Sequence, residues 1–185
     1  MKQTQTENSH FEAKVKLRQK FLPDTDSLKV LDCFSADGKL WNEIKKHNPE
    51  RKINVLRIES RRDAKGVYLA GDNRKILPVI NLERYDIIDL DAFGNPFEQL
   101  EIIFPRRIKP CRYFCTVIFQ TIGKKVQKGL LEQLGYTPKM IKKCWTLCSN
   151  NPFEKFCNYL SLHKVKEVYA IRFNGGFKNY ISFFR

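Results

Sequence analysis

Short apolar runs alternate with helical stretches through most of the chain, and this alternation constrains the fold more than any other feature. The apolar runs that predict strands are 28–34, 52–58, 67–70, 85–90 and 112–120. The stretches with helical spacing or helix-ending signals are 38–46, 74–82, 97–104 and 124–134. Strands separated by helices form right-handed βαβ units. The sequence therefore predicts an α/β fold with a mostly parallel sheet and helices on both faces.

The C-terminal end departs from this alternation. Two β-rich runs, 165–173 and 177–184, flank the tripeptide Asn174-Gly175-Gly176. Glycine and asparagine between two such runs indicate an antiparallel hairpin. The expected sheet thus has seven strands, five from the alternating part and two from the hairpin. We expect one domain over 28–185.

A basic segment, 1–27, precedes this domain. Residues 9–22 place apolar side chains among lysines and predict an amphipathic helix, with Ser9 as a possible N-cap. Pro23 would end this helix. The segment is therefore expected to add one basic helix to the fold.

The charge balance is strongly positive, with 34 Lys and Arg against 20 Asp and Glu and a formal net charge of +14. Such an excess favours a nucleic acid partner through phosphate contacts. A basic surface that serves only solubility is the alternative. We expect nucleic acid, RNA more than DNA, and no membrane, because no apolar stretch approaches the length of a span.

The six cysteines are expected to be free thiols in a reducing compartment, the cytoplasm, because no signal peptide is evident at the start. Two C-x3-C pairs, at 111/115 and 144/148, could form a four-thiolate zinc site. Cys115, however, lies in an apolar strand-like run. Buried structural thiols are the preferred interpretation, and we expect no metal.

The first predicted strand leads into Leu31-Asp32-Cys33-Phe34-Ser35-Ala36-Asp37-Gly38. A tight turn after strand one, followed by a helix, lets backbone approach a nucleoside ligand closely. Glu59 ends the second strand, 21 residues after Gly38. A carboxylate there can accept hydrogen bonds from both ribose hydroxyls. An exposed Glu at a strand end is the alternative.

Two further acidic segments end later strands. Gly71-Asp72-Asn73 follows the third strand, where Asp72 could also be a helix N-cap. Asp89-Leu90-Asp91-Ala92-Phe93-Gly94-Asn95-Pro96 ends the fourth strand, at the edge where parallel sheets bind ligands. The second segment could be a turn, because Asp, Gly, Asn and Pro are turn formers. Three acids in six residues (86–91) at the end of a buried strand repel one another and cost stability, however, so their presence favours a functional role.

These segments together resemble the class I, Rossmann-like, S-adenosylmethionine-dependent methyltransferases. Their first motif reads like LD-x-F-x-G-x-G, and Ala36 stands at its middle glycine. The resemblance implies S-adenosylmethionine as cofactor. It implies a binding site made of Asp32, Phe34, Ala36, Gly38, Glu59, Asp72 and Asn73, with Asp72 and Asn73 at the adenine.

The fourth segment, D-L-D-A-F-G-N-P, is similar to the motif D-x-D-P-Y/F-G-S-P of the tRNA guanine-N2 dimethyltransferases. Ala92 and Asn95 replace its first proline and its serine. The resemblance implies methylation of an exocyclic base nitrogen in RNA, such as tRNA, or in DNA. A carboxylate that accepts an N–H of the amine would make that nitrogen a better nucleophile. We assign this role to Asp91, with Asp89 as second candidate.

Phe93, or else Phe97, could stack on an extruded base. Two other functions stay open: a methyltransferase acting on a protein or small molecule, and a catalytically inactive nucleic-acid-binding or scaffold subunit. Ala36 and Ala92 are the features that favour the inactive subunit. Cofactor binding would distinguish that subunit from the two enzymes.

Overall fold

The computed structural model describes residues 10–107, 109–119, 126 and 128–185. Its centre is one seven-stranded sheet in the order β3-β2-β1-β4-β5-β7-β6. The strands are β1 (Ser27–Asp32), β2 (Lys52–Glu59), β3 (Leu69–Ala70), β4 (Ile87–Leu90), β5 (Arg112–Ile118), β6 (Glu167–Phe173) and β7 (Lys178–Phe184). The first five pair in parallel, and β7 pairs antiparallel with both β5 and β6. The predicted Rossmann-like sheet and its hairpin are confirmed.

The helices between these strands are α1 (Phe11–Lys20), α2 (Lys39–Lys46), α3 (Asn73–Ile76), α4 (Phe97–Ile103), α5 (Lys128–Gln133), α6 (Pro138–Lys143), α7 (Trp145–Ser149) and α8 (Pro152–Leu162). Short 3-10 turns at Leu82–Arg84 and Asn174–Gly176 complete the described elements. None of these helices has the length and apolarity needed to cross a bilayer.

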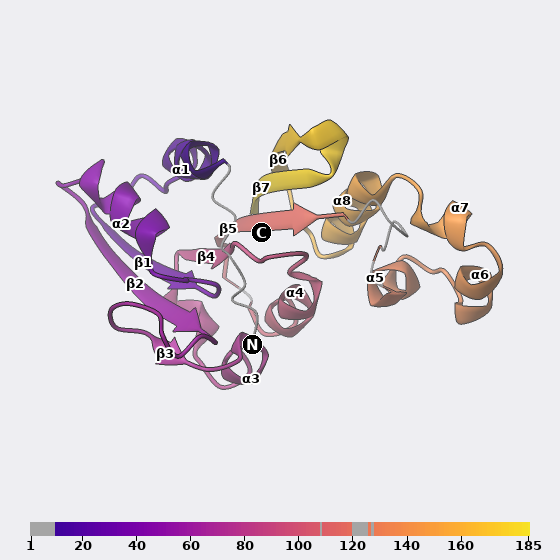
Figure 1. Cartoon of the computed structure of the whole chain (residues 1–185), viewed down its shortest axis with the longest axis horizontal. Coiled ribbons are helices and arrows are strands. Elements are labelled where there is room, and N and C mark those ends of the chain that lie inside the picture. Colours follow the sequence, from indigo (N-terminus) through magenta and orange to yellow (C-terminus); the bar gives the residue numbers. More distant parts are fainter. Residues whose placement is uncertain (1–9, 108, 120–125, 127) are drawn as a thin grey trace.

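Two hydrophobic clusters cover the two faces of the sheet. Figure 1 shows α1 and α2 on one side and α3 and α4 on the other. Neighbouring residues of one strand alternate between the clusters: Val30 and Ile87 pack with α1 and α2, whereas Leu31 and Ile88 pack with α4, α5 and α8. This alternation is the period-two pattern of a strand buried on both faces.

The first helix is part of this packing. Val15 and Leu17 of α1 share a cluster with Trp41 and Ile44 of α2. The helix predicted over 9–22 is thus present in a shorter form, and the proposed N-cap Ser9 lies outside the described residues. The helical part of the 1–27 segment packs directly onto the face of the sheet.

Some predicted boundaries were wrong. The helix expected over 74–82 is the single turn α3, because Pro78 has no N–H to continue the ladder. The third strand has two residues rather than four, and the fourth begins at Ile87. The start of the helix expected over 124–134, and residue 120 of the fifth predicted strand, lie outside the described residues.

Residues 138–162 form three helices that the sequence pattern did not predict. Thr137 caps α6 with its side chain, and Pro138 occupies the first helical position. Asn151 and Pro152 open α8 in a similar way, although without a side-chain cap. In Figure 1, α6 and α7 lie at the far end of the molecule from β2, while α8 packs back against α5.

Candidate cofactor and acceptor site

Two adjoining cavities lie beyond the carboxyl ends of the parallel strands. The larger cavity, about 440 Å³, is lined by Cys33, Phe34, Glu59, Ser60, Gly71, Asp72, Asn73, Arg74, Ala92, Phe93, Asn95, Glu98 and Gln99. The smaller cavity, about 100 Å³, is lined by Phe11, Lys14, Asp32, Phe34, Ser35, Ala36, Asp37, Lys39, Leu40, Asp91, Ala92, Phe93, Thr116, Ile118 and Lys178. Phe34, Ala92 and Phe93 line both. The larger volume is in the range of small-molecule sites.

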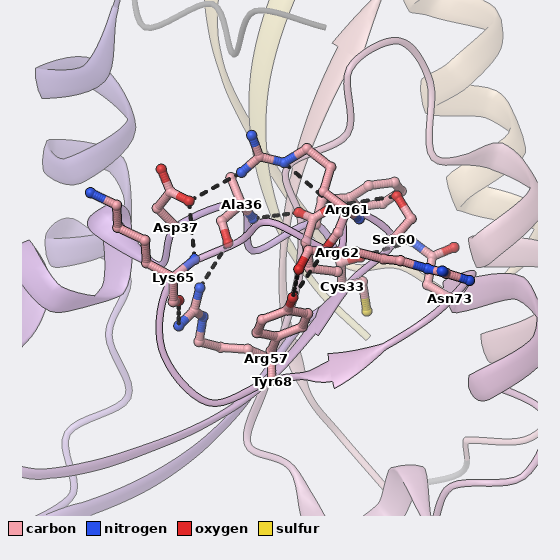
Figure 2. A network of polar contacts seen from close by, with 12 residues as sticks. Cys33, Ala36, Asp37, Arg57, Ser60, Arg61, Arg62, Lys65, Tyr68 and Asn73 are labelled. Atoms are coloured by element: carbon pink, nitrogen blue, oxygen red, sulfur yellow. Dashed lines mark hydrogen bonds and ion pairs between the residues drawn. The ribbon is translucent and has the colours of Figure 1, made fainter. Parts of the chain in front are cut away.

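Ala36 occupies the left-handed region at φ 45°, a conformation that glycine adopts freely and alanine does not. The Ala36 N–H donates to Glu59 Oε2 at 2.7 Å, and Arg57 Nη2 donates to the Ala36 carbonyl at 2.7 Å. Figure 2 shows Ala36 within this polar network. The loop therefore keeps a glycine-like backbone because two side chains of β2 bind the alanine on both sides.

Glu59 is buried at the end of β2 and lines the larger cavity. Besides the Ala36 N–H on Oε2, its carboxylate accepts the Arg61 N–H at 2.9 Å and the Ser60 hydroxyl at 3.3 Å, both on Oε1. A carboxylate has about four acceptor positions, so Oε2, with one bond, can accept a further hydrogen bond. Glu59 thus joins two loops and can also face a ligand in the larger cavity.

Asp72 and Asn73 line the same cavity. Asp72 accepts the Arg74 N–H as the N-cap of α3, and the Arg74 guanidinium lowers the pKa of this carboxyl. Asn73 is buried, donating to the Cys33 carbonyl at 2.8 Å and accepting from Gln99 at 2.9 Å. The helix-cap interpretation of Asp72 is confirmed, and its place in the cavity leaves the ligand role as a prediction.

Asp91 lies in the smaller cavity, one residue beyond β4. Its Oδ2 accepts from Lys14 Nζ at 2.8 Å, and its Oδ1 accepts from the Thr116 hydroxyl. Burial alone would raise the pKa of this carboxyl, but Arg18 and Lys14 lower it below its ordinary value. Asp91 is therefore an ionised acceptor facing a small cavity.

Asp89, the second catalytic candidate, is placed differently. It lines neither cavity and is fully buried. Arg18 donates to both carboxylate oxygens at 2.7 Å, and Trp41 Nε1 donates to Oδ2 at 2.8 Å. These three bonds hold α1 and α2 against β4 and leave Asp89 with no face toward a cavity. We therefore do not retain it as a catalytic candidate.

Asp32 is buried in the wall of the smaller cavity, where its Oδ1 accepts the Phe34 N–H at 3.3 Å. Burial, and then the neighbouring carboxylates of Asp89 and Asp91, raise its pKa well above the ordinary value. The ionised form of this carboxyl is therefore disfavoured, and a cationic group of a ligand beside it would stabilise that form.

The two phenylalanines considered for base stacking differ in exposure. Phe93 is 71% exposed at the rim shared by the two cavities, whereas Phe97 is 2% exposed and packs against Tyr159. Phe97 therefore belongs to the core. Phe93 remains the candidate for a stacking contact.

Several residues of the smaller cavity were not predicted, among them Phe11, Lys14, Thr116 and Lys178. A signal for the first two existed, because Phe11, Lys14 and Arg18 lie on one helix face by their spacing. Thr116 comes from inside an apolar strand, and Lys178 begins the last strand of the hairpin. Nothing in their local sequence indicates a site.

The cysteines do not converge. Within the described ranges, no group of three or more histidine, cysteine or acidic side chains could hold a metal ion. All six thiols are free. Of the four considered for zinc, Cys144 is exposed, whereas Cys111, Cys115 and Cys148 are buried.

The fold of the chain is similar to that of solved methyltransferases. A SAM-dependent methyltransferase from Archaeoglobus fulgidus matches with a TM-score of 0.57 and 12% identity, over 95% of this chain and 94% of that protein. TYW2 of M. jannaschii, in complex with AdoMet, matches with a TM-score of 0.54 and 12% identity, over 98% and 77%. No protein-family model and no curated protein sequence matches the chain.

Larger methyltransferases contain the same fold. A putative O-methyltransferase from Nostoc punctiforme matches with a TM-score of 0.54 and 14% identity, and a putative class I methyltransferase from Listeria monocytogenes with 0.58 and 10%. The chain covers only 55% and 60% of the lengths of these two proteins. At these identities the likeness shows the fold: a class I methyltransferase fold.

Proposed function

We propose that the chain is an S-adenosylmethionine-dependent methyltransferase that methylates an exocyclic base nitrogen of RNA, or of DNA. The observation that carries the proposal is the pair of adjoining cavities at the carboxyl ends of β1, β2 and β4. One contains Glu59 and the other contains the ionised Asp91, and they meet at Phe34, Ala92 and Phe93. Such a pair can hold a methyl donor and an acceptor side by side.

The residues of the larger cavity fit the nucleoside part of the cofactor. Glu59 would accept ribose hydroxyls, and Asp72 and Asn73 would lie at the adenine. Asp32, in the adjoining wall, would face the cationic amino-acid part. A cation there would stabilise the ionised form of this carboxyl, whose pKa is raised by burial and by neighbouring carboxylates. S-adenosylmethionine, when bound, supplies the electrophilic methyl group.

The residues of the smaller cavity fit an amine acceptor. The carboxylate of Asp91 would accept an N–H of the acceptor nitrogen and take up its developing positive charge. Phe93, exposed at the rim, offers a stacking surface for an unpaired base. Lys39 is exposed and Lys14 part-buried at the same cavity, and both favour a polyanionic substrate.

The inactive scaffold subunit is the second candidate, and one contact favours it. The Lys14 ammonium already occupies one oxygen of Asp91, as an acceptor amine would. In an enzyme, the Lys14 ammonium would have to leave Asp91, or donate to it together with the substrate amine, when substrate binds. A methyltransferase for a protein or small molecule would use the same two cavities.

Calorimetric titration with S-adenosylmethionine and S-adenosylhomocysteine tests the cofactor. We expect saturable micromolar binding that Glu59→Ala abolishes and that the exposed control Glu50→Ala retains. The absence of binding by the wild-type chain would remove the enzyme proposal in favour of the scaffold.

Methyl transfer to tRNA and to duplex DNA tests the acceptor. We expect Asp91→Asn to keep S-adenosylhomocysteine affinity within about twofold while kcat falls at least about 100-fold, the usual contribution of a proton-accepting group. Unchanged turnover in Asp91→Asn would show that another group receives the proton. Transfer to neither nucleic acid, with cofactor binding intact, would point to a protein or small-molecule acceptor.

A further inference from the structure

We infer that Arg57 is a positioning residue for the cofactor, because it holds Ala36 in the left-handed conformation that the cofactor loop requires. This inference rests on the proposed function. It explains how a chain with alanine at this loop position retains a glycine-like turn.

The sheet brings Arg57 to the loop. In the register of β1 and β2, Arg57 lies opposite Asp32, the last residue of β1. Arg57 and Glu59 are two residues apart, so their side chains leave the same face of β2. Glu59 accepts the N–H of Ala36 and Arg57 donates to its carbonyl, each at 2.7 Å. Both peptide groups of Ala36 are thereby fixed from one strand.

The other arm of Arg57 reaches the segment after β2. Its Nη1 donates to the Lys65 carbonyl at 2.9 Å, and its guanidinium lies 5.9 Å from the Tyr68 ring centre. Figure 2 shows Arg57 linking Ala36 to Lys65, while Asp37 ties the same two loops through Arg61 and Lys65. One planar group therefore connects the loop after β1 with the loop after β2.

Two glycines provide room for this group. A Cβ on Gly38 would lie 2.7 Å from the Arg57 Cζ, and a Cβ on Gly66 would lie 2.8 Å from its Nη1. The guanidinium thus fills the space that two side chains would otherwise take. A lysine at position 57 would carry its three N–H donors on one nitrogen, so it lacks the planar fork by which Nη1 and Nη2 bind two separate carbonyls.

The experiment is a double-mutant cycle on the full chain, read by S-adenosylhomocysteine affinity and by the KM and kcat of methyl transfer. We expect Arg57→Met to weaken the affinity about tenfold, the size of one lost charge-assisted hydrogen bond, and to raise KM for S-adenosylmethionine while kcat at saturation stays within about twofold. Arg57→Lys should remain nearly as weak. The nearby exposed Arg62→Met, which removes the same charge, should bind as the wild type does.

The background Ala36→Gly supplies the decisive comparison. Because glycine adopts the turn unaided, the penalty of Arg57→Met should fall to about threefold or less in that background. The same tenfold penalty in both backgrounds, or wild-type affinity in Arg57→Met, overturns the inference while wild-type binding upholds the proposed function. Absence of binding by the wild type overturns both.

Amide hydrogen exchange gives a readout that needs no cofactor. The amide of Ala36 should exchange faster in Arg57→Met than in Arg62→Met, because the turn that holds it has lost one of its two fixings. Equal exchange in the two variants also overturns the inference.

Discussion

Ala36 illustrates how one residue can keep a conformation that its side chain opposes. A left-handed alanine costs about 1–2 kcal/mol, and the bonds from Glu59 and Arg57 offset that cost. Replacement by glycine removes the cost but increases the conformational entropy of the unfolded chain.

We expect Ala36→Gly to stabilise the fold by about 0.5 kcal/mol, because the strain relieved in the folded state exceeds the cost of the greater entropy of the unfolded chain. Ala92→Gly is the matched control, because Ala92 is buried without a positive φ and should lose stability. Urea unfolding of the three proteins measures both changes. A loss of stability in Ala36→Gly would show that the alanine is not strained.

The ionisation of Asp32 makes the stability of the fold depend on pH. Its folded-state pKa lies well above the ordinary value of 3.8, chiefly because it is buried and secondarily because Asp89 and Asp91 lie nearby. The folded chain then binds this proton more tightly than the unfolded chain does. The contribution of Asp32 to the free energy of unfolding is therefore fully present below pH 3.8 and is lost as pH rises to the folded-state pKa.

We therefore expect Asp32→Asn to be more stable than the wild type at pH 7, by about 1 kcal/mol, with the difference vanishing near pH 3. Asparagine retains the oxygen that accepts the Phe34 N–H. Asp37→Asn is the control, because hydrogen bonding to Lys65 N–H lowers the Asp37 pKa and no such gain should follow. Unfolding curves between pH 3 and 7 measure the difference, and a gain that persists at pH 3 would rule out ionisation as its cause.

At the scale of the element, α1 is anchored by a buried ion pair. Arg18 binds Asp89 through two hydrogen bonds of 2.7 Å, and neither side chain is more than 2% exposed. The same helix supplies Lys14 to Asp91 one turn earlier. The helix therefore both completes the core and contributes to the smaller cavity.

We expect Arg18→Met to destabilise the fold by about 3–5 kcal/mol, because Asp89 would remain as an unpaired buried charge. Adding Asp89→Asn should recover part of that loss, since the Trp41 N–H would still find an acceptor. The exposed Lys16→Met, on the same helix, should change stability by less than about 0.5 kcal/mol. Chemical denaturation measures all three, and a loss below 1 kcal/mol in Arg18→Met would show that this pair does not anchor the helix.

At the scale of the whole molecule, the net charge of +14 predicts how a nucleic acid would bind. Each phosphate contact contributes about −0.7 to −0.9 to the slope of log affinity against log salt, so three or more contacts give a slope of about −2 or steeper. Lys39→Gln, at the smaller cavity, should make the slope shallower by nearly one unit.

Lys52→Gln, at the amino end of β2 and away from both cavities, should leave the slope unchanged. Fluorescence anisotropy of labelled tRNA over a range of salt concentrations measures these slopes. Affinity that does not respond to salt would exclude a nucleic acid as the acceptor.

Local signals in the sequence are sufficient to predict the class of fold and the positions of most strands. Strand and turn signals are local: apolar runs such as 28–34 and 52–58, and the Asn174-Gly175-Gly176 turn, depend on neighbouring residues alone. The carboxyl ends of parallel strands meet at one edge, so Glu59, Asp72 and Asp91 could be assigned to one site. Of the helices in 138–162, α6 and α7 are only six and five residues long, too short to show a helical period, whereas α8 buries Phe156, Tyr159 and Leu160 at a helical spacing that could have predicted it.

Tertiary contacts, in contrast, determine which of two neighbouring acids faces a cavity. Asp89 and Asp91 are alike in sequence, but partners 71 and 77 residues away, Arg18 and Lys14, separate a buried anchor from a cavity acceptor. The same holds for Ala36, whose strained turn depends on Arg57 and Glu59 of the next strand. Such contacts form between segments distant in the chain, and their geometry follows from strand register and helix packing, which local sequence does not encode.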